Sequence, residues 1–322
     1  MNYILLVVGF ILLIKGADIF VDSASNLAKK MGIPSMIVGL TIVSLGTSAP
    51  ELAVSLISAI NGTSDIAIGN VLGSNIFNSL LVLGGTAVIV PLLFKKSNIK
   101  RDFMVNLLVT FLVFILAFGF NLKDNNLSRV DGIVLLVLCV VYIGWLVYSV
   151  KKENKSIEKT QIEMDEVKEI NIARNITIAI IGVAGIVIGG DIVVDAATNI
   201  ATSIGMSEKL VGLTIVAMGT SLPELVTSIV AAIKGEKEIA LGNVLGSNIF
   251  NLLLILGLSC FISPFVVDPS LVTDFIVLIV GTLLIGGLIF FNRGEEKKFS
   301  RIDGLILVLM YIGYLSYIIM RN

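Results

Sequence analysis

The chain has 322 residues, of which 56% are hydrophobic and 15% are charged, and its net charge is −1. About 25% of the residues of a soluble domain are charged, so this composition indicates a chain embedded in a membrane. The near-neutral charge gives no indication of a nucleic-acid partner. The sequence contains no histidine, which excludes imidazole metal sites and histidine-dependent nucleophiles. Cys139 and Cys260 lie within apolar runs and are expected to be small buried residues.

Ten apolar runs follow one another, each long enough for a membrane-spanning helix. The first is interrupted by Lys15 and Asp18 and has no cleavage site, so it is interpreted as a spanning helix and not as a signal peptide. No run alternates with the period of two that barrel strands show, so all ten are predicted to be helices. The expected spans are Asn2–Asn26, Met36–Ala59, Ile66–Phe94, Phe103–Leu122, Val130–Val150, Ile176–Ala197, Leu210–Ile233, Ile239–Val266, Phe275–Phe291 and Ile302–Met320.

Basic residues are unequally distributed over the connectors between these runs. The odd-numbered connectors hold 18 of the 23 Lys and Arg residues, whereas the even-numbered connectors and the C-terminus hold 4. Cytoplasmic connectors of membrane proteins are enriched in Lys and Arg. We therefore expect the odd-numbered connectors to be cytoplasmic and both termini to lie outside.

An internal repeat relates the two halves of the chain. Residues 39–78 read GLTIVSLGTSAPELAVSLISAINGTSDIAIGNVLGSNIFN, and residues 212–251 read GLTIVAMGTSLPELVTSIVAAIKGEKEIALGNVLGSNIFN, with 27 of 40 positions identical at a shift of 173. Each half holds five spans, an odd number, so the second half enters the membrane from the opposite side, as in many secondary transporters. We expect an all-α membrane protein built from two inverted five-helix repeats, 1–150 and 176–322, joined by a cytoplasmic linker over 151–175.

Two glutamates lie in the middle of equivalent spans. Glu51 and Glu224 occupy the second and seventh runs, where a carboxylate costs about 2.5–3.5 kcal/mol unless it is paired or hydrated. Lys15, the one basic residue within a span, is a poor partner for two carboxylates on different helices. A bound cation is therefore the simplest compensation.

Prolines and hydroxyl residues precede both glutamates. Pro50 and Pro223 have no N–H, so each helix is predicted to break there and leave carbonyls free to face a cavity. Broken helices of this kind supply cation ligands in transporters. The hydroxyl residues one turn before the glutamates are Thr47, Ser48, Thr220 and Ser221, and the carbonyls of Ser44 and Ala217 are expected near the same face.

Matching polar stripes occupy the third and eighth runs, where Asn and Ser recur every four residues. Carboxylate, hydroxyl, amide and carbonyl oxygens together suit hard cations such as Na⁺ and Ca²⁺. Two carboxylates balance one Ca²⁺, and more than one Na⁺ balances the same charge, so the two ions can compete for one site. The stripes are Asn70, Ser74 and Asn78 in the first half and Asn243, Ser247 and Asn251 in the second.

Acidic residues in the first span of each half are a weaker candidate. Asp18 and Asp22 match Asp191 and Asp195 at the shift of 173. We interpret them as interfacial hydrogen-bonding groups or helix-end charges.

The motifs GTSAPEL and GTSLPEL, each followed by GNVLGSNIFN, resemble the two repeats of the sodium/calcium exchanger family within the cation/Ca²⁺ antiporter superfamily. The resemblance implies a transporter with no cofactor, whose partners are the lipid bilayer and the transported Na⁺ and Ca²⁺. It also implies that helices 1 and 6 slide across a fixed core. The ion ligands it implies are Glu51, Glu224, Thr47, Thr220, Ser48, Ser221, Ser74, Ser247, Asn78, Asn251, Ser44 and Ala217.

Several alternatives stay open. Proton/Ca²⁺ exchangers of the superfamily typically show GNxxE in place of GTSxPE, so the motif favours Na⁺ coupling over H⁺ coupling. Some relatives carry Asp where Asn251 stands, which argues against K⁺ co-transport. A cation channel would conduct without obligatory exchange, and an enzyme is disfavoured because no nucleophile–base pair is present. The short linker leaves no room for a large regulatory domain and suggests a prokaryotic cell membrane.

Overall fold

The computed structural model describes residues 1–62, 64–119, 125–157, 171–205, 217–290 and 296–321. In this part of the chain, eight helices are long and apolar enough to cross a membrane, and a ninth span is a helix pair bent by 51°. The short apolar helix Leu222–Ile233 is the described part of the expected seventh span, whose first residues lie outside the described ranges. These helices agree with the predicted all-α membrane protein of ten spans.

The elements of the two halves follow in the same order. The first half contains α1 (Asn2–Met31), α2 (Ser35–Val38), the π-turn η1 (Gly39–Val43), α3 (Ser44–Thr47), α4 (Ala49–Ile60), α5 (Ser64–Phe77), η2 (Asn78–Val82), α6 (Leu83–Ile89), β1 (Leu92–Lys95), α7 (Lys96–Phe118), β2 (Asn126–Leu127) and α8 (Arg129–Ile157). The second contains α9 (Ile172–Ser203), α11 (Ala217–Gly219), α12 (Leu222–Ile233), α13 (Lys237–Phe250), η4 (Asn251–Ile255), α14 (Leu256–Ile262), β3 (Phe265–Val266), α15 (Leu271–Phe290), β4 (Glu296–Phe299) and α16 (Arg301–Arg321).

Two of the expected spans end earlier than predicted. The runs Ile66–Phe94 and Ile239–Val266 were expected to be helical to their ends, but α6 and α14 stop before Pro91 and Pro264. The residue before each proline is extended, with φ of −130° and −136°. Proline disfavours the helical conformation of the residue that precedes it. The chain therefore leaves each helix there and continues as strand β1 or β3.

The helices beside the expected linker are longer than predicted. Helix α8 continues to Ile157 and α9 begins at Ile172, so both extend into the segment 151–175. The residues between them, 158–170, lie outside the described ranges. The division of the chain into two repeats at this linker stays a prediction.

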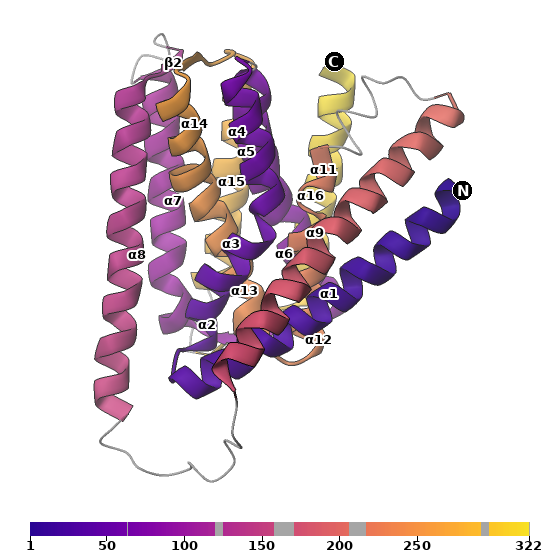
Figure 1. Ribbon diagram of the computed structural model, residues 1–322. Helices are drawn as coiled ribbons and strands as arrows, with labels where there is room; N and C mark the ends of the chain where they lie inside the picture. Colours follow the sequence, from indigo (N-terminus) through magenta and orange to yellow (C-terminus); the bar gives the residue numbers. More distant parts are fainter. Residues whose placement is uncertain (63, 120–124, 158–170, 206–216, 291–295, 322) are drawn as a thin grey trace.

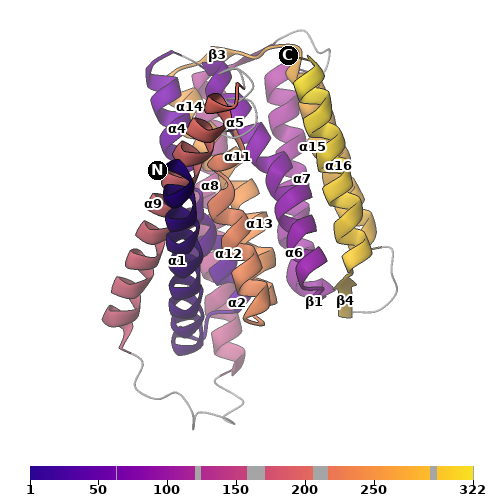
Figure 2. The ribbon, with the colours of Figure 1, turned by 90° about the vertical axis from the view of Figure 1, so that its right-hand side faces the viewer.

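Two short antiparallel sheets connect strands from different halves. Strand β1 pairs with β4, with Leu92 opposite Phe299, and β2 pairs with β3, with Asn126 opposite Val266. Figure 2 shows β1 and β4 at the lower end of the bundle and β3 at the upper end. Strands β1 and β3 follow equivalent helices of the two halves, so their placement at opposite ends agrees with the inverted arrangement.

Helices α1 and α9 lie side by side along one side of the bundle (Figure 1). They approach so closely that a Cβ added to Gly16 would lie 2.7 Å from the backbone nitrogen of Ile186 and 2.8 Å from the carbonyl oxygen of Gly182. Small residues permit such close approach of membrane helices. The pair also covers the core, because a Cβ on Gly46 would lie 3.1 Å from the ring of Phe20.

Candidate ion-binding site

Both glutamate-bearing helices are interrupted just before the glutamate. In the first half the segments Ser35–Thr47 and Ala49–Ile60 meet at an angle of 51°. The residues at the interruptions, Ser48 and Ser221, have φ and ψ of −81° and 12° and of −95° and 6°. These values belong to the sparsely populated bridge region, in which functional residues are often found. The predicted breaks are confirmed.

The prolines form part of the helix starts that follow the breaks. Pro50 and Pro223 occupy first-turn positions of α4 and α12, where a backbone N–H has no helical partner to lose. Glu51 and Glu224 lie in the same first turns. A helix N-terminus favours negative charge, so each carboxylate sits where the local backbone supports its ionised form.

Each glutamate accepts a hydrogen bond from a serine of the other half. The hydroxyl of Ser221 lies 2.8 Å from Oε1 of Glu51, and the hydroxyl of Ser48 lies 2.8 Å from Oε1 of Glu224. The hydroxyl of Ser247 lies 3.4 Å from the same Glu224 oxygen and 3.1 Å from that of Ser48. The two breaks therefore form one continuous polar centre shared by both halves.

The second oxygen of each glutamate has no partner among the residues that the structure describes. Glu51 and Glu224 are fully buried, and Oε2 of each accepts no hydrogen bond from these residues. No ion pair within the described part of the chain involves either carboxylate. Buried carboxylates are normally paired or bound to a metal ion. The other buried polar atoms of this centre without partners are Ser74 Oγ, both amide atoms of Asn78 and Asn251 Oδ1.

Two asparagines connect the break of one half to the third helix of the other. The hydroxyl of Thr47 lies 3.1 Å from Oδ1 of Asn243, and the hydroxyl of Thr220 lies 3.3 Å from Oδ1 of Asn70. Asn243 in turn donates to the carbonyl of Glu224, at 3.3 Å. The threonine hydroxyls thus have protein partners. These hydrogen bonds hold each helix break against the polar stripe of the other half.

The remaining expected ligands lie on the same elements. Ser44 is buried, and its carbonyl accepts a hydrogen bond of 2.9 Å from the Ser48 amide. Ala217 is the first residue of α11. Asn78 and Asn251 begin the π-turns η2 and η4, and such turns often mark functional sites. The structure brings Ser48, Ser221 and Ser247 into contact with the glutamates. The role of all twelve residues as ion ligands stays a prediction.

Asp18 and Asp22 are interfacial, as expected. The Nζ atom of Lys234 lies 2.7 Å from Asp18 Oδ1 and 2.6 Å from Asp22 Oδ1, which joins α1 to the end of α12. The equivalent acids of the second half, Asp191 and Asp195, are exposed and have no ion pair with any described residue. The sequence did not indicate this difference. Lys234 and the asparagine at the equivalent position of the first half are both residues that commonly occur in loops.

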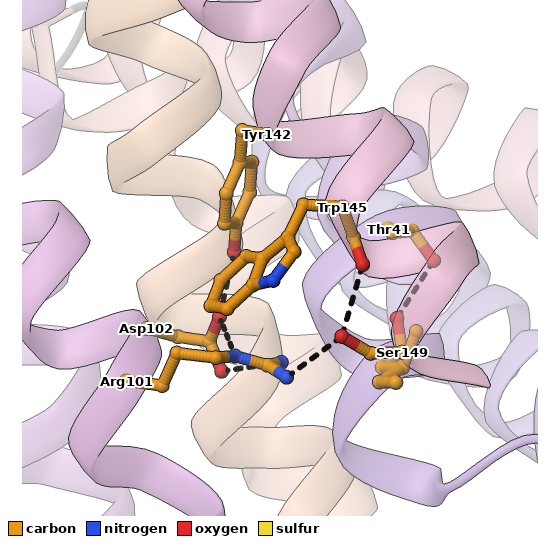
Figure 3. A network of polar contacts seen from close by, with 7 residues as sticks. Thr41, Arg101, Asp102, Tyr142, Trp145 and Ser149 are labelled. Atoms are coloured by element: carbon orange, nitrogen blue, oxygen red, sulfur yellow. Dashed lines mark hydrogen bonds and ion pairs between the residues drawn. The ribbon is translucent and has the colours of Figure 1, made fainter. Parts of the chain in front are cut away.

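The sequence analysis missed a buried acidic residue at the start of the fourth span. Asp102 is fully buried and accepts hydrogen bonds from Tyr142, at 3.1 Å, and from the adjacent Arg101, at 3.0 and 3.1 Å. The Arg101 guanidinium also lies 4.4 Å from the ring centre of Trp145 (Figure 3). Asp274, Tyr314 and Arg321 make a similar cluster in the second half. Because the partners of these aspartates are protein side chains, we interpret the aspartates as groups that connect pairs of helices.

A second set that was missed surrounds the expected ligands Asn78 and Asn251. Asn75 and Asn248 are buried, and each forms hydrogen bonds with the other half. The signal was present, because the two asparagines belong to the repeated GSNIFN segment. They were overlooked because they lie off the four-residue polar stripe.

Comparisons with known proteins place this architecture in a family. The family model described as sodium/calcium exchanger protein matches residues 1–148 and 175–320. A relative named putative antiporter CaxA, from Alkalimonas amylolytica, is 39% identical over 97% of this chain and 96% of its own length. A relative named sodium/calcium exchanger MaX1, from Methanosarcina acetivorans, is 35% identical over 98% of this chain and 97% of its own length.

Solved structures of the sodium-calcium exchanger NCX_Mj resemble this chain along its whole length. One of them, soaked with Na⁺ and Ca²⁺, superposes with a TM-score of 0.81 at 29% identity and covers 98% of this chain and 97% of its own. The apolar helices, the shared polar centre and these matches make the protein an integral membrane antiporter of the exchanger type. The chain belongs to the sodium/calcium exchanger family.

Proposed function

We propose that this protein exchanges Na⁺ for Ca²⁺ across the membrane and holds the transported cations between Glu51 and Glu224. The observation that carries the proposal is the pair of fully buried carboxylates, each with one oxygen bound by a serine of the opposite half and the other without a partner in the described part of the chain. A buried, unpaired carboxylate costs several kcal/mol. A cation between the glutamates compensates both at once.

The chemistry of the surrounding groups favours hard cations. Ca²⁺ takes six to eight oxygen ligands, which carboxylates, hydroxyls, amides and backbone carbonyls supply. We assign the two carboxylates and the hydroxyls of Ser48, Ser221 and Ser247 to the inner ligand set. The other proposed ligands are Ser74, Asn78, Asn251 and the backbone or side-chain oxygens of Thr47, Thr220, Ser44 and Ala217.

Sodium is the proposed coupling ion. The GTSxPE motif in both repeats favours it, and MaX1 and NCX_Mj are both named sodium/calcium exchangers. The alternative is proton coupling, because a carboxylate can carry a proton in place of a cation. In either case the two negative charges determine how much positive charge the site takes up. One Ca²⁺ balances both carboxylates, and so do two singly charged ions.

Alternating access is assigned to the α1–α9 pair. These helices pack on one another through glycines and on the breaks of the site helices, as with Gly46 against Phe20. Both termini lie toward one end of the bundle in Figure 1, while strands β1 and β4, which carry Lys95 and Lys298, lie at the other end in Figure 2. We propose that the basic end is cytoplasmic and that the protein resides in a prokaryotic cell membrane, with both termini outside.

The proposal is tested by radioactive calcium uptake into proteoliposomes loaded with Na⁺ and diluted into Na⁺-free buffer. Matched vesicles are loaded with K⁺ or given a pH gradient. Uptake that requires the outward Na⁺ gradient supports Na⁺/Ca²⁺ exchange. Uptake driven by the pH gradient without Na⁺ would assign the protein to H⁺/Ca²⁺ exchange, and uptake without any opposing ion would indicate a channel.

A further inference from the structure

The two asparagines that begin the π-turns, Asn78 and Asn251, occupy equivalent positions but have different surroundings. The amide nitrogen of Asn251 donates to Oδ1 of Asn75 at 3.0 Å, whereas neither amide atom of Asn78 has a hydrogen-bond partner among the described residues. All three residues are fully buried. The proposed site is therefore asymmetric at its centre, although its sequence motif is the same in both halves.

The orientation of Asn75 is fixed by a group that can only accept. Its Nδ2 lies 3.2 Å from the backbone carbonyl oxygen of Asn248. A carbonyl oxygen cannot donate, so the amide nitrogen of Asn75 must face it and Oδ1 must point the other way. Because Oδ1 can only accept, the group that meets it from Asn251 must be the amide nitrogen. The Oδ1 of Asn251 is thereby turned away from Asn75, and it is buried without a partner within the described ranges.

The counterpart of Asn75 has different partners. Asn248 donates to the hydroxyl of Ser79 at 2.8 Å, and the position equivalent to Ser79 in the second half is Leu252, which has no hydroxyl. Among the described residues, Oδ1 of Asn248 accepts no hydrogen bond, whereas Oδ1 of Asn75 accepts one from Asn251.

Asn251 shares a helix face with a residue of the polar centre. It lies four positions after Ser247, whose hydroxyl is 3.1 Å from that of Ser48 and 3.4 Å from the Glu224 carboxylate. Residues four apart on a helix are neighbours on one face. Asn251, the first residue of η4, thus continues the face of α13 on which Ser247 contacts Glu224.

We propose that Asn75 is a positioning residue that fixes Asn251 as an oxygen donor to the transported cation, while Asn78 stays free to reorient. The inference rests on the proposed function. An oxygen that is already oriented loses little freedom when the ion arrives, so it adds more to affinity than an amide that must first turn. Asn75 itself contacts no ion in this arrangement and acts through Asn251.

The test is Ca²⁺ binding to the purified full-length protein by isothermal titration calorimetry in Na⁺-free buffer, with Ca²⁺/Ca²⁺ exchange in proteoliposomes as a second readout. The variant Asn75→Leu should raise the dissociation constant about tenfold, which is the effect of losing one interaction of hydrogen-bond strength. The matched control, Asn248→Leu, removes the equivalent amide of the other half and should change the constant far less. Equal effects of the two variants would overturn the proposal.

A double-mutant cycle separates positioning from packing. In the Asn251→Ala background, Asn75→Leu should have no further effect on the dissociation constant, because the group it positions is gone. Additive effects would show that Asn75 acts independently of Asn251 and would overturn the inference. Should Asn75→Leu not give folded protein, Asn75→Ala removes the same amide without added bulk. If the unmodified protein does not bind Ca²⁺, the proposed function fails; if it binds and the Asn75 variants match it, only this inference fails.

Discussion

The hydroxyl of Ser48 lies 2.8 Å from Oε1 of Glu224, although 176 positions separate the two residues in the chain. The equivalent bond of Ser221 to Glu51 has the same length. Each half thus supplies the serine that binds the carboxylate of the other. The serine lies three residues before the glutamate in both GTSxPE motifs, which agrees with this reciprocal arrangement.

Neutralising either glutamate should abolish transport without reducing the stability of the fold. Glu51→Gln and Glu224→Gln should each abolish Ca²⁺ uptake in proteoliposomes, because the remaining single carboxylate cannot balance a divalent cation. The same variants, purified without Ca²⁺ and Na⁺, should unfold at the same or a higher temperature, because a buried charge is replaced by a neutral amide of similar size.

The control for this prediction is Glu238→Gln, since Glu238 is only partly buried and accepts a hydrogen bond from Asn98, which does not belong to the polar centre. It should transport normally. Added Ca²⁺ should raise the unfolding temperature of the unmodified protein and of Glu238→Gln but not of the two site variants. Full Ca²⁺ uptake by Glu51→Gln would contradict the site assignment.

The serines should show coupling across the halves. Ser48→Ala and Ser221→Ala each remove one hydroxyl from a carboxylate, so each should weaken Ca²⁺ binding about tenfold. Because the two hydroxyls bind carboxylates of different halves, Ser48→Ala should keep its effect in combination with Ser221→Ala. Calorimetric titration measures each constant. An unchanged dissociation constant in Ser48→Ala would argue that its contact with Glu224 has no part in binding.

The bond between Lys234 and α1 should hold that helix to the core. Partial burial alone lowers the pKa of Lys234, but the bonds to Asp18 and Asp22 outweigh it and raise the pKa above its ordinary value. Lys234 is therefore charged at neutral pH. Lys234→Met should speed hydrogen–deuterium exchange in the second half of α1, whereas Lys30→Met, which removes an exposed lysine, should not.

The same ion pairs give a pH dependence with a defined sign. A lysine whose pKa is raised on folding contributes stability that is fully present below its unfolded pKa and is lost as the pH rises through its folded pKa. The unmodified protein should thus lose more stability than Lys234→Met when the pH is taken above about 10, the ordinary range of lysine. The contribution should stay near or below about 1 kcal/mol, because the two aspartates are substantially exposed.

The buried aspartate of α7 should contribute to stability and not to ion binding. Tyr142→Phe removes one of the donors to Asp102, and it should reduce stability by about 1–2 kcal/mol. Tyr148→Phe, at an exposed position on α8, the helix that also carries Tyr142, should have little effect on stability. Thermal unfolding in detergent measures both. A selective loss of Ca²⁺ affinity in Tyr142→Phe without loss of stability would contradict the structural role of this cluster.

The sequence predicted those features that are encoded locally. The two prolines of the GTSxPE motifs predicted the helix breaks, and the apolar runs predicted the spans. Pro91 and Pro264 indicated the ends of α6 and α14 equally clearly. The expected spans nevertheless ran past both prolines, because the apolar runs continue beyond them. The short sheets that follow were missed for the same reason.

The contacts between the halves could not be predicted from the sequence. Both GSNIFN segments are identical, so nothing within them distinguishes Asn251, held by Asn75, from the unpartnered Asn78. The distinction lies in hydrogen bonds between the halves, which require the two helices to be packed together. The attachment of Lys234 to α1 likewise joins residues that are remote in the chain.

The most direct test of the central claim is the location of the bound divalent cation. Crystals of this protein soaked with Sr²⁺ in Na⁺-free buffer, measured for anomalous scattering, should show a peak between Glu51 and Glu224 that disappears at high Na⁺ concentration. A divalent ion bound elsewhere in the bundle, with no peak between the glutamates, would contradict the account.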